Sequence, residues 1–288
     1  MAEHDINQKL IDFADDGDLA GIARLLAQGA DPLARDSLAL CFAAKKGHVD
    51  CVRLLIPVSD PKADFSEALG WAACNGHAEC VKLLIPVSDP KGRDSQALVF
   101  AAVQGHAECV KLLIPVSDTM VNKSQALAFA ADNGHVKCVE LLLPVSDPES
   151  SESQALSFAA GNGYSECVKL LIPFSNAKAN DSNAIRQAAL NGSVECFKLL
   201  IPASAPLIEI GELIADVIHA GHANILCLML AHEPRLLKKV DLPSALAAAT
   251  ADGRFEMAAM LSSIVEKEVF AAHLPSLPAC KPQAPRRL

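Results

Sequence analysis

Seven glycines recur at intervals of 29 residues through most of the chain. They are Gly47, Gly76, Gly105, Gly134, Gly163, Gly192 and Gly221. Six of them are preceded by a serine at ten residues and followed by a cysteine at four and a proline at ten. Because these four residue types keep the same spacing through six repeats, a single structural unit is copied along the chain. Such a unit cannot bury its apolar face alone. The chain must therefore fold as a stack of repeats that is stabilised by contacts between neighbours.

Each repeat is predicted to fold as two short helices. Residues 95–102 begin with Ser95, a residue type that caps helix N-termini, and continue with strong helix formers. Gly105 is expected to end this first helix in the left-handed conformation. Residues 106–114 are expected to form the second helix, because Pro115 cannot continue it. Helices this short are not stable alone in water, so stacking must hold them.

The predicted all-α solenoid covers residues 1–273. Further glycines extend the regular series by one step at each end, at irregular spacings of 30 and 32 residues, which makes about nine stacked helix-turn-helix repeats. Because the ends of a solenoid need polar outer faces, the irregular units at about 4–35 and about 241–273 are predicted to be caps. Residues 274–288 are rich in proline and lack periodicity, which predicts a flexible tail.

Charge and hydropathy limit the partners and the compartment. The formal charge is −9, with 34 acidic and 25 basic residues. Neither nucleic acid nor an anionic membrane is expected as a partner, because both bind basic surfaces. The N-terminus has no pattern of a secretory signal, and charged residues, proline or glycine interrupt every apolar run well before about 18 residues. The prediction is a cytoplasmic protein, or one delivered into a host cytosol without a cleavable signal peptide.

The motif His-x-x-Cys is the strongest candidate for chemistry. It occurs as His48/Cys51, His77/Cys80, His106/Cys109 and His135/Cys138. Tetrahedral zinc needs three or four ligands at about 2.0–2.3 Å, whereas equivalent positions on stacked helices lie about 8–10 Å apart. The same separation disfavours disulfides. The cysteines are predicted to be reduced, buried core residues, with no metal or cofactor bound.

Catalysis is not predicted either. An active site is normally unique within its chain, so a pair copied four times indicates architecture, and the sequence contains no phosphate loop or nucleophile elbow. An aromatic residue also recurs in the first helix of five repeats, as Phe42, Trp71, Phe100, Phe129 and Phe158. We expect these rings in the helical core, because a platform for stacking bases would need basic neighbours.

The sequence around the glycines resembles the ankyrin repeat. The first thirteen positions of the family pattern AAxxGHxxxVxxLL are matched by residues 101–113, and again around Gly47, Gly76 and Gly134. The resemblance implies an ankyrin-like solenoid that binds proteins and has no catalytic residues. The repeat has 29 residues against the family's usual number of about 33, and the family's TPLH is replaced by sequences such as Gln-Ala-Leu-Val. The finger loops between repeats are therefore expected to be stubby or absent.

Partner-binding residues are predicted where the repeats differ from one another. One such set lies just before each glycine, a position that lines the concave surface of ankyrin proteins, and the other lies in the loops between repeats. Phe65, Met120 and Val121 are apolar at exposed-type positions, which suits anchors for a partner. The candidate partner-binding residues are Asn75, Val103, Gln104, Met120, Val121, Asp132, Asn133, Glu149, Glu152 and Asn162.

The predicted function is a non-catalytic, monomeric scaffold that binds an unknown protein through its concave face and inter-repeat loops. An alternative is a targeting or inhibitory module of a host-directed bacterial effector or of an enzyme regulator. A third hypothesis, a metal or redox protein built on the His-x-x-Cys ladder, is the least favoured because each repeat supplies too few ligands.

Overall fold

The computed structural model describes residues 2–204, 206 and 212–273. The chain divides into two compact units, Met1–Pro206 and Leu207–Leu288. In the part of the chain that the structure describes, all regular elements are helices, and they form nine helix pairs. The predicted all-α fold of about nine pairs is confirmed, and the absence of strands from the described residues agrees with the expected lack of finger hairpins.

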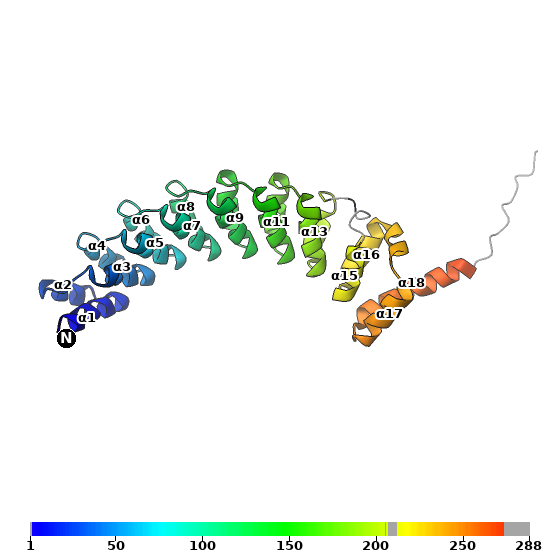
Figure 1. Cartoon of the computed structure of the whole chain (residues 1–288), viewed down its shortest axis with the longest axis horizontal. Coiled ribbons are helices and arrows are strands. Elements are labelled where there is room, and N and C mark those ends of the chain that lie inside the picture. The colour runs from blue at the N-terminus through cyan, green and yellow to red at the C-terminus, as the bar shows by residue number, and fades with distance from the viewer. Residues whose placement is uncertain (1, 205, 207–211, 274–288) are drawn as a thin grey trace, which may run out of the picture. The chain divides into compact units, whose positions relative to one another are not determined.

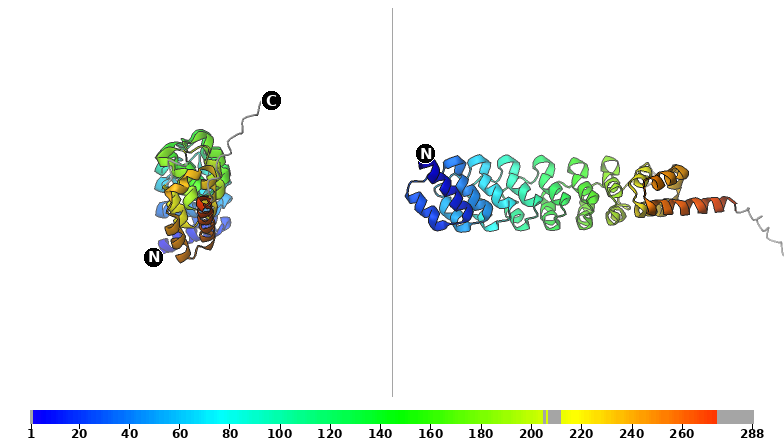
Figure 2. Two further views of the ribbon diagram at one scale, coloured as in Figure 1. Left: turned by 90° about the vertical axis from the view of Figure 1, so that its right-hand side faces the viewer. Right: turned by 90° about the horizontal axis from the view of Figure 1, so that it is seen from below.

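The first unit contains seven helix pairs. The helices are α1 (Ala2–Asp16), α2 (Leu19–Ala27), α3 (Ala34–Lys46), α4 (Val49–Leu55), α5 (Ala63–Cys74), α6 (Ala78–Leu84), α7 (Gly92–Val103), α8 (Ala107–Leu113), α9 (Val121–Asp132), α10 (Val136–Leu142), α11 (Ser150–Gly161), α12 (Ser165–Leu171), α13 (Ala179–Leu190) and α14 (Val194–Leu200). Short 3-10 turns, η1 (Leu143–Val145) and η2 (Ile172–Phe174), follow α10 and α12. Within this unit the row of pairs is curved, with the first helices on the inner side and the second helices on the outer side (Figure 1). The right-hand view of Figure 2, seen from below, shows the pairs of this unit following one another in a single row.

Repeated residues form the core of the first unit. In the Gly105 repeat, Leu98, Ala101 and Ala102 of α7 and Cys109 and Val110 of α8 are all buried. The small alanines let neighbouring first helices approach closely, while each buried leucine contributes about 1.5–3 kcal/mol. The outward Glu–Lys pairs of the second helices, with N–O distances of 2.5–2.8 Å, are exposed and contribute little to stability.

The serine of each repeat has a different role from the one predicted. Arg93, Asp94 and Ser95 adopt left-handed backbone angles, with φ values of 44°, 57° and 58°, before the right-handed part of α7 begins. The Oγ atom of Ser95 makes no cap on its own helix and accepts a hydrogen bond from the N–H of Asp118 at 2.8 Å. The same bond, over 23 residues, recurs in four other repeats. The prediction of an N-cap was wrong, because this hydroxyl holds the loop that leads into the next repeat.

The glycine and the histidine connect successive repeats. Gly105 has the expected left-handed conformation, with φ of 77°. The ring of His135, in the next repeat, lies so close that a Cβ added to Gly105 would be 2.5 Å from Nδ1. Nε2 of the same ring is 2.9 Å from the carbonyl oxygen of Val103, the last residue of α7. Because carbonyls at a helix end lack an intrahelical donor, the histidine caps the preceding repeat's first helix. His48, His77 and His106 do the same.

The second unit has two helix pairs and a 3-10 segment. The elements are α15 (Leu213–Ala220), α16 (Ala223–His232), η3 (Pro234–Lys239), α17 (Leu242–Ala251) and α18 (Phe255–His273). The predicted C-terminal cap, 241–273, corresponds to α17 and α18, and its capping role stays a prediction. The predicted tail, 274–288, lies outside the described residues. None of the helices described is both long and apolar enough to cross a membrane.

Candidate functional site

The aromatic residues of the first helices lie on the surface of the stack. Phe42, Trp71, Phe100, Phe129 and Phe158 are all half-buried. The leucine two positions earlier in each helix, such as Leu98, is fully buried instead. Two residues along a helix correspond to a turn of about 200°, so the leucine and the ring point to nearly opposite sides. The expectation of core placement for these rings is therefore wrong, and they form a partly exposed apolar stripe on the first helices.

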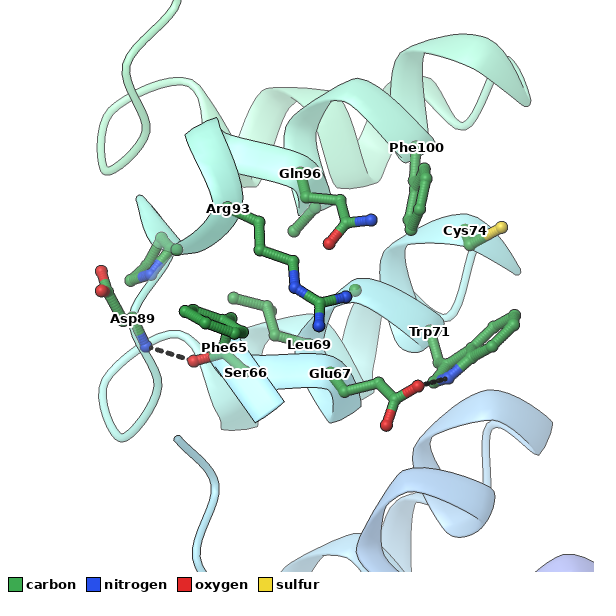
Figure 3. A pocket seen from close by; sticks show the side chains of 14 residues that line it. Phe65, Ser66, Glu67, Leu69, Trp71, Cys74, Asp89, Arg93, Gln96 and Phe100 are labelled. Carbon is green, nitrogen blue, oxygen red and sulfur yellow. Dashed lines mark hydrogen bonds between the residues drawn. The ribbon is translucent and has the colours of Figure 1, made fainter. Parts of the chain in front are cut away.

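A cavity of about 380 Å³ opens between α5 and α7 (Figure 3). We call it the Gly70 pocket. Its main lining residues are Phe65, Glu67, Gly70, Trp71, Arg93 and Phe100. A Cβ added to Gly70 would lie 3.9 Å from the Phe100 ring, so a small side chain could be accommodated there and a larger one would enter the pocket. Equivalent positions in other repeats carry Cys41, Val99, Ala128, Ser157 and Arg186. The missing side chain at Gly70 therefore contributes the space.

Trp71 and Glu67 are joined by a hydrogen bond in the lining of this pocket. The indole Nε1 of Trp71 donates a hydrogen bond to Oε1 of Glu67 at 3.0 Å (Figure 3). The ammonium group of Lys45 lies over the Trp71 ring, 4.6 Å from its centroid. Oε2 of Glu67 has the thiol of Cys41 as its partner, at 4.0 Å. Burial, together with a smaller effect of the nearby negative charge of Glu67, raises the pKa of Cys41 to about 12.

Arg93 and Phe65 occupy the other end of the pocket. The Arg93 guanidinium lies over the Phe65 ring at 4.8 Å from the centroid, and its Nη2 is 2.6 Å from Oδ1 of Asp64. Phe65 is 63% exposed, which agrees with its predicted position on the surface. At this end of the pocket, one basic side chain thus contacts both an aromatic ring and a carboxylate.

The cysteines of the repeated motif are buried in the structure, and its histidines are hydrogen-bonded to backbone carbonyls. All six cysteines of the second helices in the first unit are buried, as predicted. Burial raises the pKa of five of these thiols, those of Cys80, Cys109, Cys138, Cys167 and Cys196, to about 11. A thiol with so high a pKa is a poor nucleophile near neutral pH. Within the described ranges, no three His, Cys, Asp or Glu side chains are grouped as a metal site would need.

The family model for ankyrin repeats in three copies matches residues 10–94, 69–152 and 145–210, which together span more than half of the sequence. This chain belongs to the ankyrin-repeat family. The fold also resembles the crystal structure of the human ASB11 ankyrin repeat domain, with a TM-score of 0.59 and 24% identity over 68% of this chain and 98% of that one. No curated protein sequence matches the chain. Ankyrin repeats generally mediate protein–protein interaction, and their fold is typically a non-catalytic module.

The ten predicted partner-binding residues of this ankyrin-repeat chain are all exposed or half-buried. Val103 and Gln104 line a second cavity of about 400 Å³, which shares Arg93 and Phe100 with the Gly70 pocket. Met120 is 55% exposed beside half-buried Val121. These two residues, with Glu149 and Glu152, lie where first helices begin, whereas Val103, Gln104, Asp132 and Asn162 lie where first helices end. The predicted set is therefore split between two ends of the inner helices.

Three of the predicted residues are asparagines whose amide groups bind backbone carbonyls. Asn75 and Asn133 donate to the carbonyls of Trp71 and Phe129 in their own helices, at 2.8 and 2.9 Å. Asn162 donates instead to the preceding repeat. Its repeat carries Tyr164 in place of the capping histidine, so this amide takes over the cap. These contacts give the asparagines a structural role that the sequence comparison did not reveal.

The sequence does not predict the Gly70 pocket. Trp71 is expected in the core, and Glu67, Gly70 and Arg93 are not among the candidate partner-binding residues. The available signal was that Glu67, Gly70 and Trp71 differ from the residues at the same positions in the neighbouring repeats. Unlike the residues before each glycine, they occupy positions inside the first helix.

Proposed function

We propose that this chain is a non-catalytic, monomeric scaffold that binds a protein partner through the inner helices of its first unit and the loops between their repeats. The observation that carries the proposal is the partly exposed stripe of rings on the first helices. Aromatic residues that remain accessible beside small pockets are typical of the anchors of protein interfaces. The adjoining cavity at Val103 and Gln104 extends this surface along the stack.

Several features favour binding over catalysis and over other partners. The repeated thiols are buried with raised pKa values, and the histidines hold backbone carbonyls. The net charge of −9 disfavours nucleic acid and anionic membranes as partners. Reduced cysteines support a cytoplasmic location, which includes a host cytosol. An inhibitory or targeting role toward an enzyme would be one form of the same binding activity.

A partner-capture experiment tests the proposal. Tagged protein is used to capture partners from cell extracts, and the captured partner is purified for measurement of Kd. Val103→Asp introduces an aspartate on the inner surface. The next repeat already has an aspartate, Asp132, at the equivalent position, so the stack should tolerate the change. We expect it to weaken binding at least tenfold, or about 1.4 kcal/mol, because it puts a charge into an apolar contact. Met120→Ser with Val121→Ser should weaken binding by about 1–3 kcal/mol if the loops take part.

The control is the double variant Glu108→Gln, Lys111→Gln, which changes two exposed residues of α8 on the outer side. It should bind like the wild type. Equal binding by all the variants would remove the inner surface from consideration. Light scattering on the purified protein tests whether it is a monomer. If the captured partner is an enzyme, an assay of its activity with and without this chain tests the inhibitory role.

A further inference from the structure

The repeat that contains Gly76 differs from the others at positions that surround one pocket. Glu67 stands where the others have Gln, Asn or Leu, and Gly70 stands where they have larger residues. Trp71 replaces a phenylalanine of four other repeats, and Phe65 stands where the others carry a charged residue. All four residues line the Gly70 pocket. Four replacements thus meet at one cavity, which sets this pocket apart from the corresponding surface of the other repeats.

The chemistry of these replacements favours a positively charged ligand. Glu67 adds a carboxylate. Among the described residues, its Oε2 atom has only the Cys41 thiol as a partner, at 4.0 Å, and this weak donor leaves the oxygen able to accept stronger hydrogen bonds. Trp71 offers the aromatic side chain that binds cations best. Lys45 and Arg93 show that rings at this site do hold cations, at 4.6 and 4.8 Å from the ring centroids.

The charge around the pocket agrees with this reading. Arg93 is neutralised by its ion pair with Asp64 at 2.6 Å, whereas Lys45 contacts the rings of Trp71 and Phe42. Asp89 and Glu67 add negative charge to the lining. A partner cation can therefore take the place of the Lys45 ammonium on Trp71, since Lys45 is only half-buried and its long side chain can turn toward water.

The shape of the pocket distinguishes among cations. Gly70 and Phe100 give it an apolar wall beside the carboxylate, and its volume of about 380 Å³ admits one long side chain. Arginine combines an apolar stem with a planar head that stacks on a ring and pairs with a carboxylate through two N–H groups. A compact ammonium group can lie over a ring, as that of Lys45 does, but it is not planar and cannot pair with a carboxylate through two parallel N–H groups.

We propose that the Gly70 pocket binds one arginine side chain of the partner protein, with the guanidinium on the Trp71 ring and hydrogen-bonded to Glu67, and with the stem along Phe100. This inference rests on the proposed protein-binding function and adds the chemistry of the partner residue. Figure 3 shows the three side chains around the same opening.

Intrinsic fluorescence provides the test, because Trp71 is the only tryptophan of the chain. The probes are acetylated, amidated pentapeptides of alanine with a central arginine, citrulline, norleucine or glutamate, each titrated into the full-length protein. Citrulline has the shape of arginine without its charge. We expect a saturable change of Trp71 fluorescence with the arginine peptide at a concentration at least about tenfold below that for citrulline, since charge-assisted contacts are lost in the analogue.

Two variants locate the binding. Glu67→Gln installs the residue that other repeats have, such as Gln96, and Gly70→Val installs the residue found at Val99, so both should fold. Each should weaken binding of the arginine peptide about tenfold or more, Glu67→Gln by removing the charge and Gly70→Val by filling the space. Glu108→Gln, which removes one negative charge from the outer side, should bind like the wild type. Urea unfolding checks that each variant is folded.

Several outcomes would overturn the inference. These are no response to any peptide, equal responses to arginine and citrulline, a stronger response to norleucine, or binding unaffected by Glu67→Gln. The proposed function is judged separately, by the effect of Val103→Asp on the captured partner. Loss of partner binding in that variant without any arginine response would leave the scaffold function standing and reject the arginine pocket alone.

Discussion

The side-chain amide of Asn162 donates a hydrogen bond of 2.9 Å to the carbonyl oxygen of Asp132, the last residue of the preceding repeat's first helix. In the next repeat, where Ser193 replaces the histidine, the Asn191 amide binds the Gly161 carbonyl in the same way, at 3.1 Å. The helix end is thus capped across the repeat boundary by whichever donor the next repeat supplies. This relationship separates asparagines that connect repeats from those that bind within one helix.

Asn162→Ala should therefore destabilise the protein by about 1 kcal/mol, because a helix-end carbonyl loses its partner. Asn133→Ala should cost less, since Asn133 bonds within its own helix and His135 already supplies the inter-repeat cap. Adding Tyr164→His to Asn162→Ala should restore most of the lost stability. Urea unfolding of the three variants gives the free energies, and equal losses for Asn162→Ala and Asn133→Ala would contradict this account.

Ser95→Ala is expected to destabilise the first unit by about 1–2 kcal/mol, because the Asp118 amide loses its acceptor and the left-handed turn loses its tie. Ser117 is the matched control, since its buried hydroxyl oxygen has no hydrogen-bond partner among the residues that the structure describes. Ser117→Ala should change stability little. Thermal unfolding followed by circular dichroism measures both, and a Ser117→Ala loss as large as that of Ser95→Ala would argue against the role given to the Ser95 bond.

Gly105→Ala should be more harmful than Gly29→Ala. Both glycines have positive φ values, of 77° and 88°, so each alanine variant carries a backbone cost of about 1–2 kcal/mol. The added methyl at Gly105 would also meet the His135 ring at 2.5 Å, whereas the one at Gly29 would meet no atom within 4 Å. The difference between the two unfolding free energies measures the ring contact. A difference near zero would show that the ring shifts without cost.

Thiol labelling should follow burial. Exposed Cys227 and half-buried Cys74 are expected to react with iodoacetamide in the folded protein at pH 8, ahead of buried Cys109. The pKa of Cys109 is raised from 9.0 to about 11, which lowers its thiolate fraction roughly 100-fold at this pH in addition to the effect of access. Mass spectrometry of the digested protein identifies the labelled cysteines. Early labelling of Cys109 would show that the stack opens readily.

Alkaline pH should destabilise the stack through the same thiols. A pKa that folding raises from 9.0 to about 11 means that the folded state binds the Cys109 proton more tightly, so its contribution is complete below pH 9 and is lost as pH rises toward 11. Cys109→Val nearly keeps the volume and removes this titration. The urea midpoint of the wild type should fall more steeply between pH 9 and 11 than that of the variant. Parallel curves would exclude a contribution from this thiol.

The sequence predicts the repeat, the helix pairs and the buried cysteines, because each of these features recurs at the same position in several repeats. It does not predict the Ser95 bond, since a serine before helix formers fits a cap equally well and the true donor is 23 residues away. The Phe100 ring is misplaced for a related reason. Its helix is apolar on almost every side, so periodicity does not show which face meets a neighbour. The Gly70 pocket depends on a missing side chain, which only the packed helices reveal.

The bonds between repeats have a consequence for how the gene can change. The Ser95–Asp118 bond and the His106–Cys74 bond each span less than two repeats, so every copy is held by its immediate neighbours. Recombination that removes or inserts one whole copy leaves each remaining copy with the same kind of neighbours. The coding sequence can therefore lengthen or shorten by whole repeats. A repeat added or removed between the Gly70 pocket and Met120 would change the distance between these two sites.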